Sequence, residues 1–189
     1  LELAQANRQV HIETECLRNL GLLFFFENRY PEALAYLDRS LELCLQTGNQ
    51  RGESASLNTM GTIHLISGDT EKARSYYQQS QSLLNNLGDQ RGEGRLINNL
   101  GCVHQGEGDN YRALAYFEQA LRVDQEIGDR WGISTTLTNL GITYHRLGEL
   151  ARARTVYEQA IQVCGEIGQW AGGAGGLSHL GLLHYPLGE

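Results

Sequence analysis

Apolar residues recur along the chain with the period of an α-helix, in two stripes that repeat together. The first stripe has the spacing i, i+3, i+4, i+7, as in Leu57, Met60, Gly61 and His64. The second stripe begins twelve residues after Gly61 and runs through Ala73, Tyr76, Tyr77 and Ser80. Such spacing places side chains on one face of an amphipathic helix. The pattern predicts two helices per unit, which we call helix A and helix B.

The stripes belong to a repeat of forty residues. A glycine preceded by a large apolar residue marks each copy, at Gly21, Gly61, Gly101, Gly141 and Gly181. A second series closes each unit, at Gly48, Gly88, Gly128 and Gly168. Recurrence in one register over the whole chain indicates a repeat architecture. The predicted units are residues 11–50, 51–90, 91–130 and 131–170, with a partial unit at 171–189.

Short polar turns separate helix A from helix B. A Gly-Asp or Gly-Glu step occurs at Gly68-Asp69, Gly108-Asp109 and Gly148-Glu149. The glycine can adopt the left-handed conformation that ends a helix, and the aspartate can cap the next one. In the first unit, Asn28 and Pro31 take these roles. Each unit is therefore predicted to be an antiparallel helix hairpin.

Residue sizes at the repeat positions indicate how the hairpins pack. Glycine and alanine columns favour close approach of helix A to helix B, and a bulky column should fill space between neighbouring hairpins: Leu37, Tyr77, Phe117 and Tyr157. One hairpin cannot bury both of its surfaces, so the units are predicted to stack into an all-α solenoid. Nine full helices are expected. Residues 1–8 align with the end of a helix B, which predicts the tail of a preceding repeat in a longer array.

Composition narrows the classes of partner. The chain has 15 Lys+Arg against 22 Asp+Glu, a net charge of -7. This excess of acidic residues argues against nucleic acid or an anionic membrane surface as a partner. No apolar run approaches the length of a membrane span, and the first residues lack the order of a signal peptide. We therefore expect a cytoplasmic protein.

Residues that could carry catalysis or bind a metal are few. His64, His104 and His184 share a column with Phe24 and Tyr144, which favours packing over metal ligation. The four cysteines are scattered and are expected to be free thiols: Cys16, Cys44, Cys102 and Cys164. No set of nucleophile and base is visible, and the glycines do not form a phosphate loop. The sequence predicts no enzyme, no metal and no cofactor.

Two segments carry a family resemblance. NNLGCVHQGEGDNYRALAYFEQAL and TNLGITYHRLGELARARTVYEQAI resemble the tetratricopeptide repeat in its forty-residue form, and the resemblance covers residues 11–189. The linkers LGDQRGE and IGDRWGI are similar to those of Pins/LGN-type adaptors and of bacterial signalling arrays. The resemblance implies a right-handed superhelical solenoid whose A helices line a concave groove that binds a peptide or partner protein.

The groove positions implied by the family form an apolar part near the N-terminus and a polar, slightly basic middle. They are Arg18, Asn19, Leu22, Phe25, Phe26, Asn58, Thr62, Leu65, Arg95, Asn98, Asn99, Gln105, Thr135, Asn139, Ile142, His145 and Arg146. The asparagines either bind the backbone of an extended peptide or bridge adjacent A helices, and both interpretations stay open. The family's carboxylate clamp is not matched in register, because Leu22 and Asn139 stand at two of its positions.

Two functions follow from this resemblance. The first is an interaction scaffold that binds a peptide or protein in the groove, with an apolar anchor toward the N-terminal repeats and a carboxylate near the middle. The alternative is a structural lever, sensor or oligomerisation arm of a larger signalling protein, with no ligand of its own. Self-association through uncapped ends is a further expectation.

Overall fold

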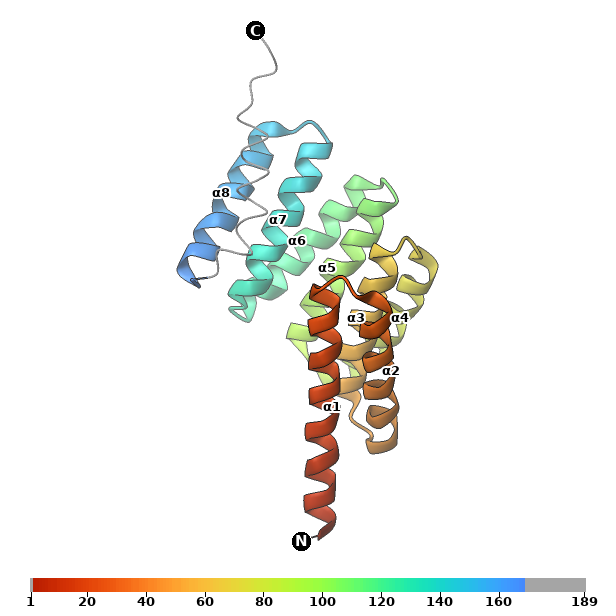
Figure 1. The fold of residues 1–189 in the computed structure, drawn as a ribbon. Coiled ribbons are helices and arrows are strands. Elements are labelled where there is room, and N and C mark those ends of the chain that lie inside the picture. The colour runs from red at the N-terminus through yellow and green to blue at the C-terminus, as the bar shows by residue number, and fades with distance from the viewer. Residues whose placement is uncertain (1, 169–189) are drawn as a thin grey trace. The chain divides into compact units, whose positions relative to one another are not determined.

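The computed structural model describes residues 2–168, with side chains from residue 9 onward, and this part of the chain is all-helical (Figure 1). The helices are α1 (Glu2–Phe26), α2 (Tyr30–Thr47), α3 (Gln50–Ile66), α4 (Thr70–Leu87), α5 (Gln90–Gly106), α6 (Asn110–Glu126), α7 (Arg130–Arg146) and α8 (Leu150–Glu166). Between residues 2 and 168 there is no strand, as predicted. The predicted ninth helix, and with it His184, lies outside the described residues.

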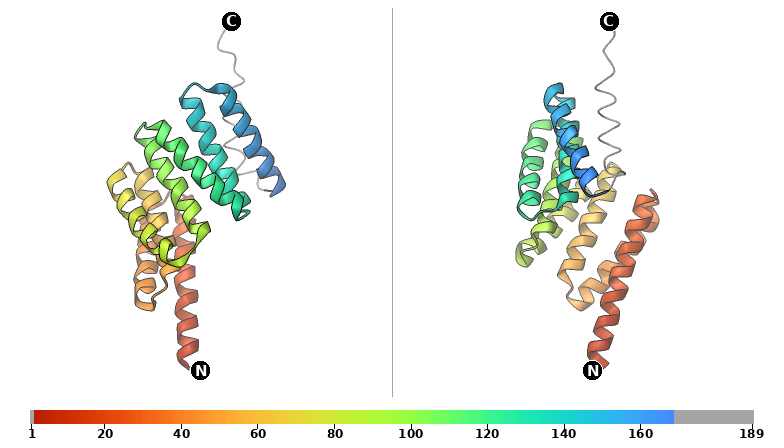
Figure 2. Two further views of the ribbon diagram at one scale, coloured as in Figure 1. Left: turned by 180° about the vertical axis from the view of Figure 1, so that it is seen from behind. Right: turned by 90° about the vertical axis from the view of Figure 1, so that its left-hand side faces the viewer.

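The turns have the predicted chemistry. Gly68, between α3 and α4, has a φ of 82°, a left-handed conformation that glycine adopts without steric cost. Asp69 then caps α4, because its Oδ1 accepts a hydrogen bond of 3.2 Å from the backbone N–H of Lys72. In the first hairpin Asn28 takes the left-handed position, with a φ of 58°, and proline lies in the first turn of α2. Consecutive helices therefore run antiparallel in pairs (Figures 1 and 2).

Close packing inside each hairpin depends on the glycine column. A Cβ atom on Gly61 would lie 2.6 Å from Cε1 of Tyr77, and one on Gly101 would lie 2.6 Å from Cε1 of Phe117. These distances are too short for any side chain, so the bulky residue of helix B occupies the space over the glycine. The bulky column thus fills space inside its own hairpin, in addition to the space between hairpins that the sequence suggested.

The chain divides into two compact units, Leu1–Gly92 and Glu93–Glu189, each of which we describe by itself. In the first unit, Leu37 of α2 packs in one apolar cluster with Met60 and Ile63 of α3. The bulky residue thus also contacts the next hairpin. Ser40 Oγ lies 3.3 Å from Ser56 Oγ and donates to the carbonyl of Thr14 at 3.2 Å.

In the second unit, an apolar cluster joins Phe117 of α6 to helices α7 and α8. Ile133, Leu137 and Leu140 of α7 belong to it, together with Ala160 and Val163 of α8. Tyr144 and Val156 lie at its edge, partly exposed. Each unit therefore has an apolar core at the repeat positions that the sequence pattern marked.

Helix α1 differs from the prediction at its start. The sequence predicted a helix end within residues 1–8, but α1 continues without a break from Glu2 to Phe26. The assignment of residues 1–8 to a preceding repeat stays a prediction. Every helix described between residues 2 and 168 is too short or too polar to span a bilayer.

Candidate functional site

In the first unit, the predicted groove residues lie on α1 and α3 with different exposures. Phe26 is 73% exposed, at the last position of α1. Phe25 is half-buried and packs against the Leu37 cluster, with its ring centroid 6.2 Å from that of Tyr30. Truncating Phe25 would therefore disturb the core as well as the surface. Phe26 is the aromatic side chain of this pair that lies open to a partner.

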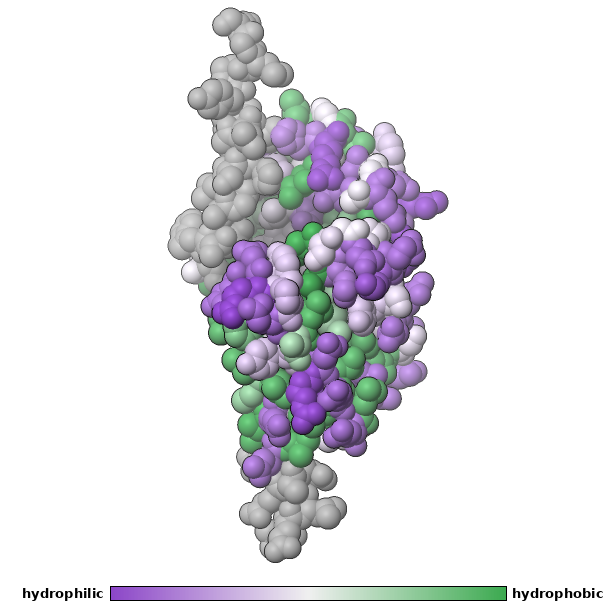
Figure 3. Space-filling view, turned by 45° about the vertical axis from the view of Figure 1, so that its right-hand side comes forward, coloured by the Kyte–Doolittle hydropathy of each residue, from purple (hydrophilic) through white to green (hydrophobic). Residues whose placement is uncertain are grey.

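The other candidates of the first unit surround these aromatics with mixed chemistry. Leu22 on α1 and Leu65 on α3 are half-buried, and Asn19 is exposed. The hydroxyl of Thr62 donates to the carbonyl of Asn58 at 3.0 Å and lies 3.2 Å from the hydroxyl of Tyr77. Exposed large apolar side chains reach the surface among polar ones, as Figure 3 shows for one face. Those of the first unit are Ile12, Leu20, Leu23, Phe26, Leu45 and Ile66.

In the second unit, polar side chains of α5 pair with those of α7. Asn139 Nδ2 donates to Asn98 Oδ1 at 3.0 Å, and Gln105 Nε2 donates to Thr143 Oγ1 at 2.7 Å. Arg146 Nη1 donates to the carbonyl of Gln105 at 3.0 Å. The structure thus shows Asn98 and Asn139 bridging adjacent A helices, one of the two interpretations left open by the sequence.

The remaining candidates of this unit lie around that bridged network. Arg95, Thr135 and Arg146 are exposed, and Asn99, Ile142 and His145 are half-buried. The positive charges of Arg95 and Arg146 stand on a chain with a net charge of -7. They give the helix A surface of the second unit a local basic character that the whole chain lacks.

Sequence reasoning missed the buried carboxyl group of Asp124 on α6, which is 2% exposed. Its Oδ2 accepts a hydrogen bond of 3.2 Å from Thr136. A Cβ atom on Gly94 would lie 2.7 Å from Oδ1, and one on Gly132 would lie 2.5 Å from Cγ. The equivalent positions of Asp124 in the other hairpins are Cys44, Leu84 and Cys164.

A signal for this carboxyl group was present in the sequence. Asp124 breaks an otherwise apolar column, and Gly94 breaks a column that holds Thr14, Ser54 and Ser134 elsewhere. The two departures are coupled, because a side chain at position 94 would collide with the carboxyl group. Asp124 links α6 to the α7 side of the bridged network.

The histidine column packs against aromatic rings of helix B. His64 stacks on Tyr76 with centroids 5.4 Å apart, and His104 stacks on Tyr116 at 5.1 Å. His104 Nδ1 also lies 3.2 Å from a carboxylate oxygen of Glu107. Among the described residues, no three His, Cys, Asp or Glu side chains are grouped as metal ligands would be.

The described cysteines are free thiols with different surroundings. Cys44 and Cys164 are buried core residues, as expected, and Cys16 is exposed. Burial raises the pKa of the Cys102 thiol to about 11, so this group is protonated at neutral pH. Cys102 therefore lacks the depressed pKa of a reactive cysteine.

Comparison with known families fits this geometry. A family model described as tetratricopeptide repeat matches residues 13–86 and 93–166. The chain belongs to the tetratricopeptide repeat family. Each match covers two helix hairpins of the structure. A search of curated proteins found no match.

Solved structures of low sequence identity share the fold of this tetratricopeptide repeat protein. BtubC from P. vanneervenii is 21% identical, with a TM-score of 0.65 over 82% of this chain and 64% of that one. The Rap conjugation gene regulator of plasmid pLS20, solved with the Phr* peptide, is 16% identical, with a TM-score of 0.84 over 92% of this chain and 48% of that one. A STAND protein with a tetratricopeptide repeat sensor, from Pyrococcus horikoshii, is 14% identical, with a TM-score of 0.67 over 88% and 26%. The chain thus spans less than two thirds of each of these proteins.

Proposed function

We propose that this chain is an interaction scaffold and that a partner peptide or protein binds the exposed surface of its A helices. The observation that carries the proposal is the bridged network of α5 and α7 in the second unit. Bonds from Asn139 to Asn98 and from Gln105 to Thr143 hold neighbouring A helices together. A surface held in this way loses little conformational entropy when a partner binds.

The chemistry of that surface suits an acidic group on the partner. Arg95 and Arg146 are exposed on α5 and α7. A guanidinium pairs well with a carboxylate, and such pairs act mostly through specificity and the rate of association. The similarly folded Rap regulator was solved with a peptide. This likeness supports peptide recognition here by analogy of fold.

In the first unit, the exposed ring of Phe26 offers an apolar anchor. Aromatic side chains commonly carry a large share of the binding energy at an interface. Leu22 on α1 and Leu65 on α3 are half-buried and add apolar surface to the A helices of this unit. We infer that the partner presents an apolar residue to the first unit and a carboxylate to the second.

Selection of peptides from a random display library on the immobilised chain tests this function. Peptides rich in Asp, Glu and large apolar residues are expected to be recovered. When the recovered peptides are incubated with the immobilised variant Arg95→Ala/Arg146→Ala, the acidic peptides should stay in solution. Arg154→Ala on α8 is the matched control and should still bind them. Recovery of the same acidic peptides by the double variant would contradict the proposal.

One observation favours self-association as a second candidate function. Leu20 and Leu23 of α1 are 38% and 52% exposed, but the equivalent Met60 and Ile63 of α3 are 2% and 1% exposed. Met60 and Ile63 lie against the preceding helix B. A second copy of this chain could cover Leu20 and Leu23 in the same way with a helix of the same repeat type.

Light scattering after gel filtration tests the second candidate function. The molar mass should rise with protein concentration, and Leu23→Asp should return it to that of a monomer. Leu45→Asp on α2 is the control, since Leu45 is exposed on a helix B. A constant monomer mass for the unmodified chain would contradict self-association.

A further inference from the structure

An aromatic pair closes the turn end of the first three hairpins. In the first, Phe24 of α1 stacks on Tyr36 of α2, with ring centroids 5.2 Å apart and an interplanar angle of 14°. The equivalent pairs are His64 with Tyr76 at 5.4 Å and His104 with Tyr116 at 5.1 Å, both at 18°. In all three, the tyrosine of helix B covers the ring of helix A.

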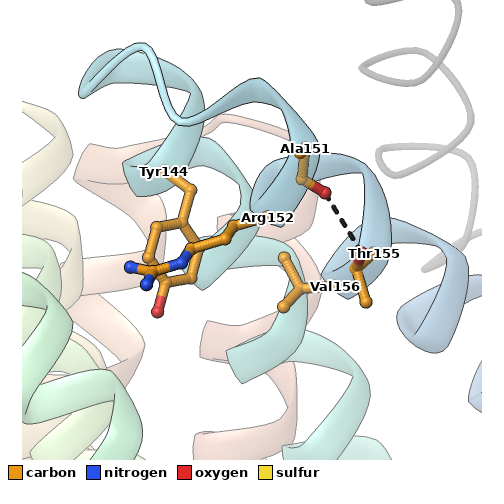
Figure 4. A pocket seen from close by; sticks show the side chains of 5 residues that line it. All are labelled: Tyr144, Ala151, Arg152, Thr155 and Val156. Atoms are coloured by element: carbon orange, nitrogen blue, oxygen red, sulfur yellow. Dashed lines mark hydrogen bonds between the residues drawn. The ribbon is translucent and has the colours of Figure 1, made fainter.

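The fourth hairpin keeps the ring of helix A and lacks the tyrosine. Tyr144 of α7 stands at the position of Phe24, and Val156 of α8 stands at the position of Tyr36. An open depression with a cavity volume of about 290 Å³ lies at this place. Its lining is formed by Tyr144, Ala151, Arg152, Thr155 and Val156 (Figure 4).

The walls of this depression have a defined chemistry. The guanidinium carbon of Arg152 lies over the Tyr144 ring, 5.8 Å from its centroid. Figure 4 shows the two side chains next to each other. The same guanidinium is paired with Glu149 at 2.7 Å. Thr155 donates its hydroxyl to the carbonyl of Ala151 at 3.1 Å, and the half-buried Val156 forms an apolar wall. The polar groups are thus engaged, the guanidinium lies over the Tyr144 ring, and the methyl groups of Thr155 and Val156 line the rest of the depression.

We propose that this depression is a docking site for an aromatic side chain of a partner protein. The occupant replaces the tyrosine that the first three hairpins supply from their own helix B. This site is separate from the helix A surface of the proposed function, and it holds whether or not a peptide binds there.

Three features select an aromatic ring over other groups. The stacked pairs of the first three hairpins show that this end of a hairpin accommodates a tyrosine ring beside the ring of helix A. The guanidinium of Arg152, which lies over the Tyr144 ring, attracts the face of a second ring through a cation–π contact. A carboxylate on the partner is disfavoured, because it would have to compete with Glu149 for Arg152. The volume of the depression is at the small end of the range for ligand pockets, so a single ring fits it better than a larger molecule.

Nuclear magnetic resonance with two small probes tests the proposal. N-acetyl-tyrosinamide added to the ¹⁵N,¹³C-labelled chain should shift the signals of Tyr144, Ala151, Arg152 and Val156, with a dissociation constant on the order of millimolar for a single ring. N-acetyl-leucinamide should shift them far less, because it lacks a ring to stack beside Arg152 and Tyr144.

Three variants locate the effect. Val156→Tyr restores the tyrosine of the other hairpins and should abolish the shifts caused by N-acetyl-tyrosinamide. Tyr116→Val in the third hairpin should create a second depression and add equivalent shifts around His104. Arg152→Ala keeps the apolar wall and should weaken binding several-fold. A thermal melt of each variant confirms that it is folded.

Several outcomes would overturn this inference. Equal shifts with both probes would mean an unspecific apolar surface. Shifts that persist in a folded Val156→Tyr variant would place the probe elsewhere. Shifts of Tyr144 and Val156 that depend on protein concentration without any probe would assign the depression to contact with a second copy of the chain.

Discussion

The two units share one hairpin architecture and differ in the chemistry at the ends of their A helices. In the first unit these positions hold Phe26 and Ile66, both exposed apolar residues. In the second unit the equivalent positions hold Gly106 and Arg146. The glycine column and the bulky residue opposite it are the same in both units. A repeat protein can therefore change its surface freely while its internal hairpin contacts stay constant.

The largest expected effect concerns what the units share. Gly61→Leu and Gly101→Leu should each lower the free energy of unfolding by about 3 kcal/mol, since the new side chain meets Tyr77 or Phe117 in a filled space. Urea unfolding measures the change. Gly106→Leu is the control, because nothing lies within 4 Å of a Cβ atom there. Equal losses for Gly101→Leu and Gly106→Leu would contradict the packing described.

A smaller effect concerns what only the second unit contains. Asn98→Ala removes the acceptor shared by Asn139 and Thr136, and should lower the free energy of unfolding by about 1–2 kcal/mol. The double variant with Asn139→Ala should lose less than the sum of the single variants, because the two side chains are bonded. Additive losses in urea unfolding would mean that the bridge contributes nothing to stability.

The smallest effect concerns the thiols. Cys102, whose pKa is raised to about 11, should react with a disulfide reagent much more slowly at pH 8 than the exposed Cys16. Its rate should rise about tenfold per pH unit up to pH 10, as the thiolate fraction grows. Mass spectrometry of labelled peptides distinguishes the two sites. Equal labelling of both at pH 8 would show that the pKa of the Cys102 thiol is not raised by desolvation.

The hairpin fold was predictable from the sequence because one pattern recurs with little variation. Gly68 and Asp69 form the expected turn and cap, and the glycine column allows the expected close approach of helix A to helix B. Local chemistry decides these features. The sequence did not predict that α1 runs unbroken through Glu2–Phe26, although Arg8 stands where Gly48 and Gly88 follow helices α2 and α4.

The candidate surface was predictable only in part, because sequence places a residue on a face and does not give its partners. Phe25 and Phe26 look equivalent in the sequence, but Phe25 packs on the core and Phe26 is exposed. For Asn98 and Asn139 the sequence left peptide binding and bridging of A helices both open. The hydrogen bond of 3.0 Å from Asn139 Nδ2 to Asn98 Oδ1 shows the bridge. Asp124 was not predicted, because it departs from the apolar column that the repeats share.

Binding affinity of a peptide selected on the chain tests the central claim, that partners contact the A helices of both units. The double variant Phe26→Ala/Arg95→Ala should bind it at least thirtyfold more weakly, which corresponds to roughly 2 kcal/mol or more. Arg95→Ala alone should weaken binding less, and by an amount that falls as salt is added. Unchanged affinity of the double variant, with loss of binding in Arg154→Ala on α8, would contradict the account.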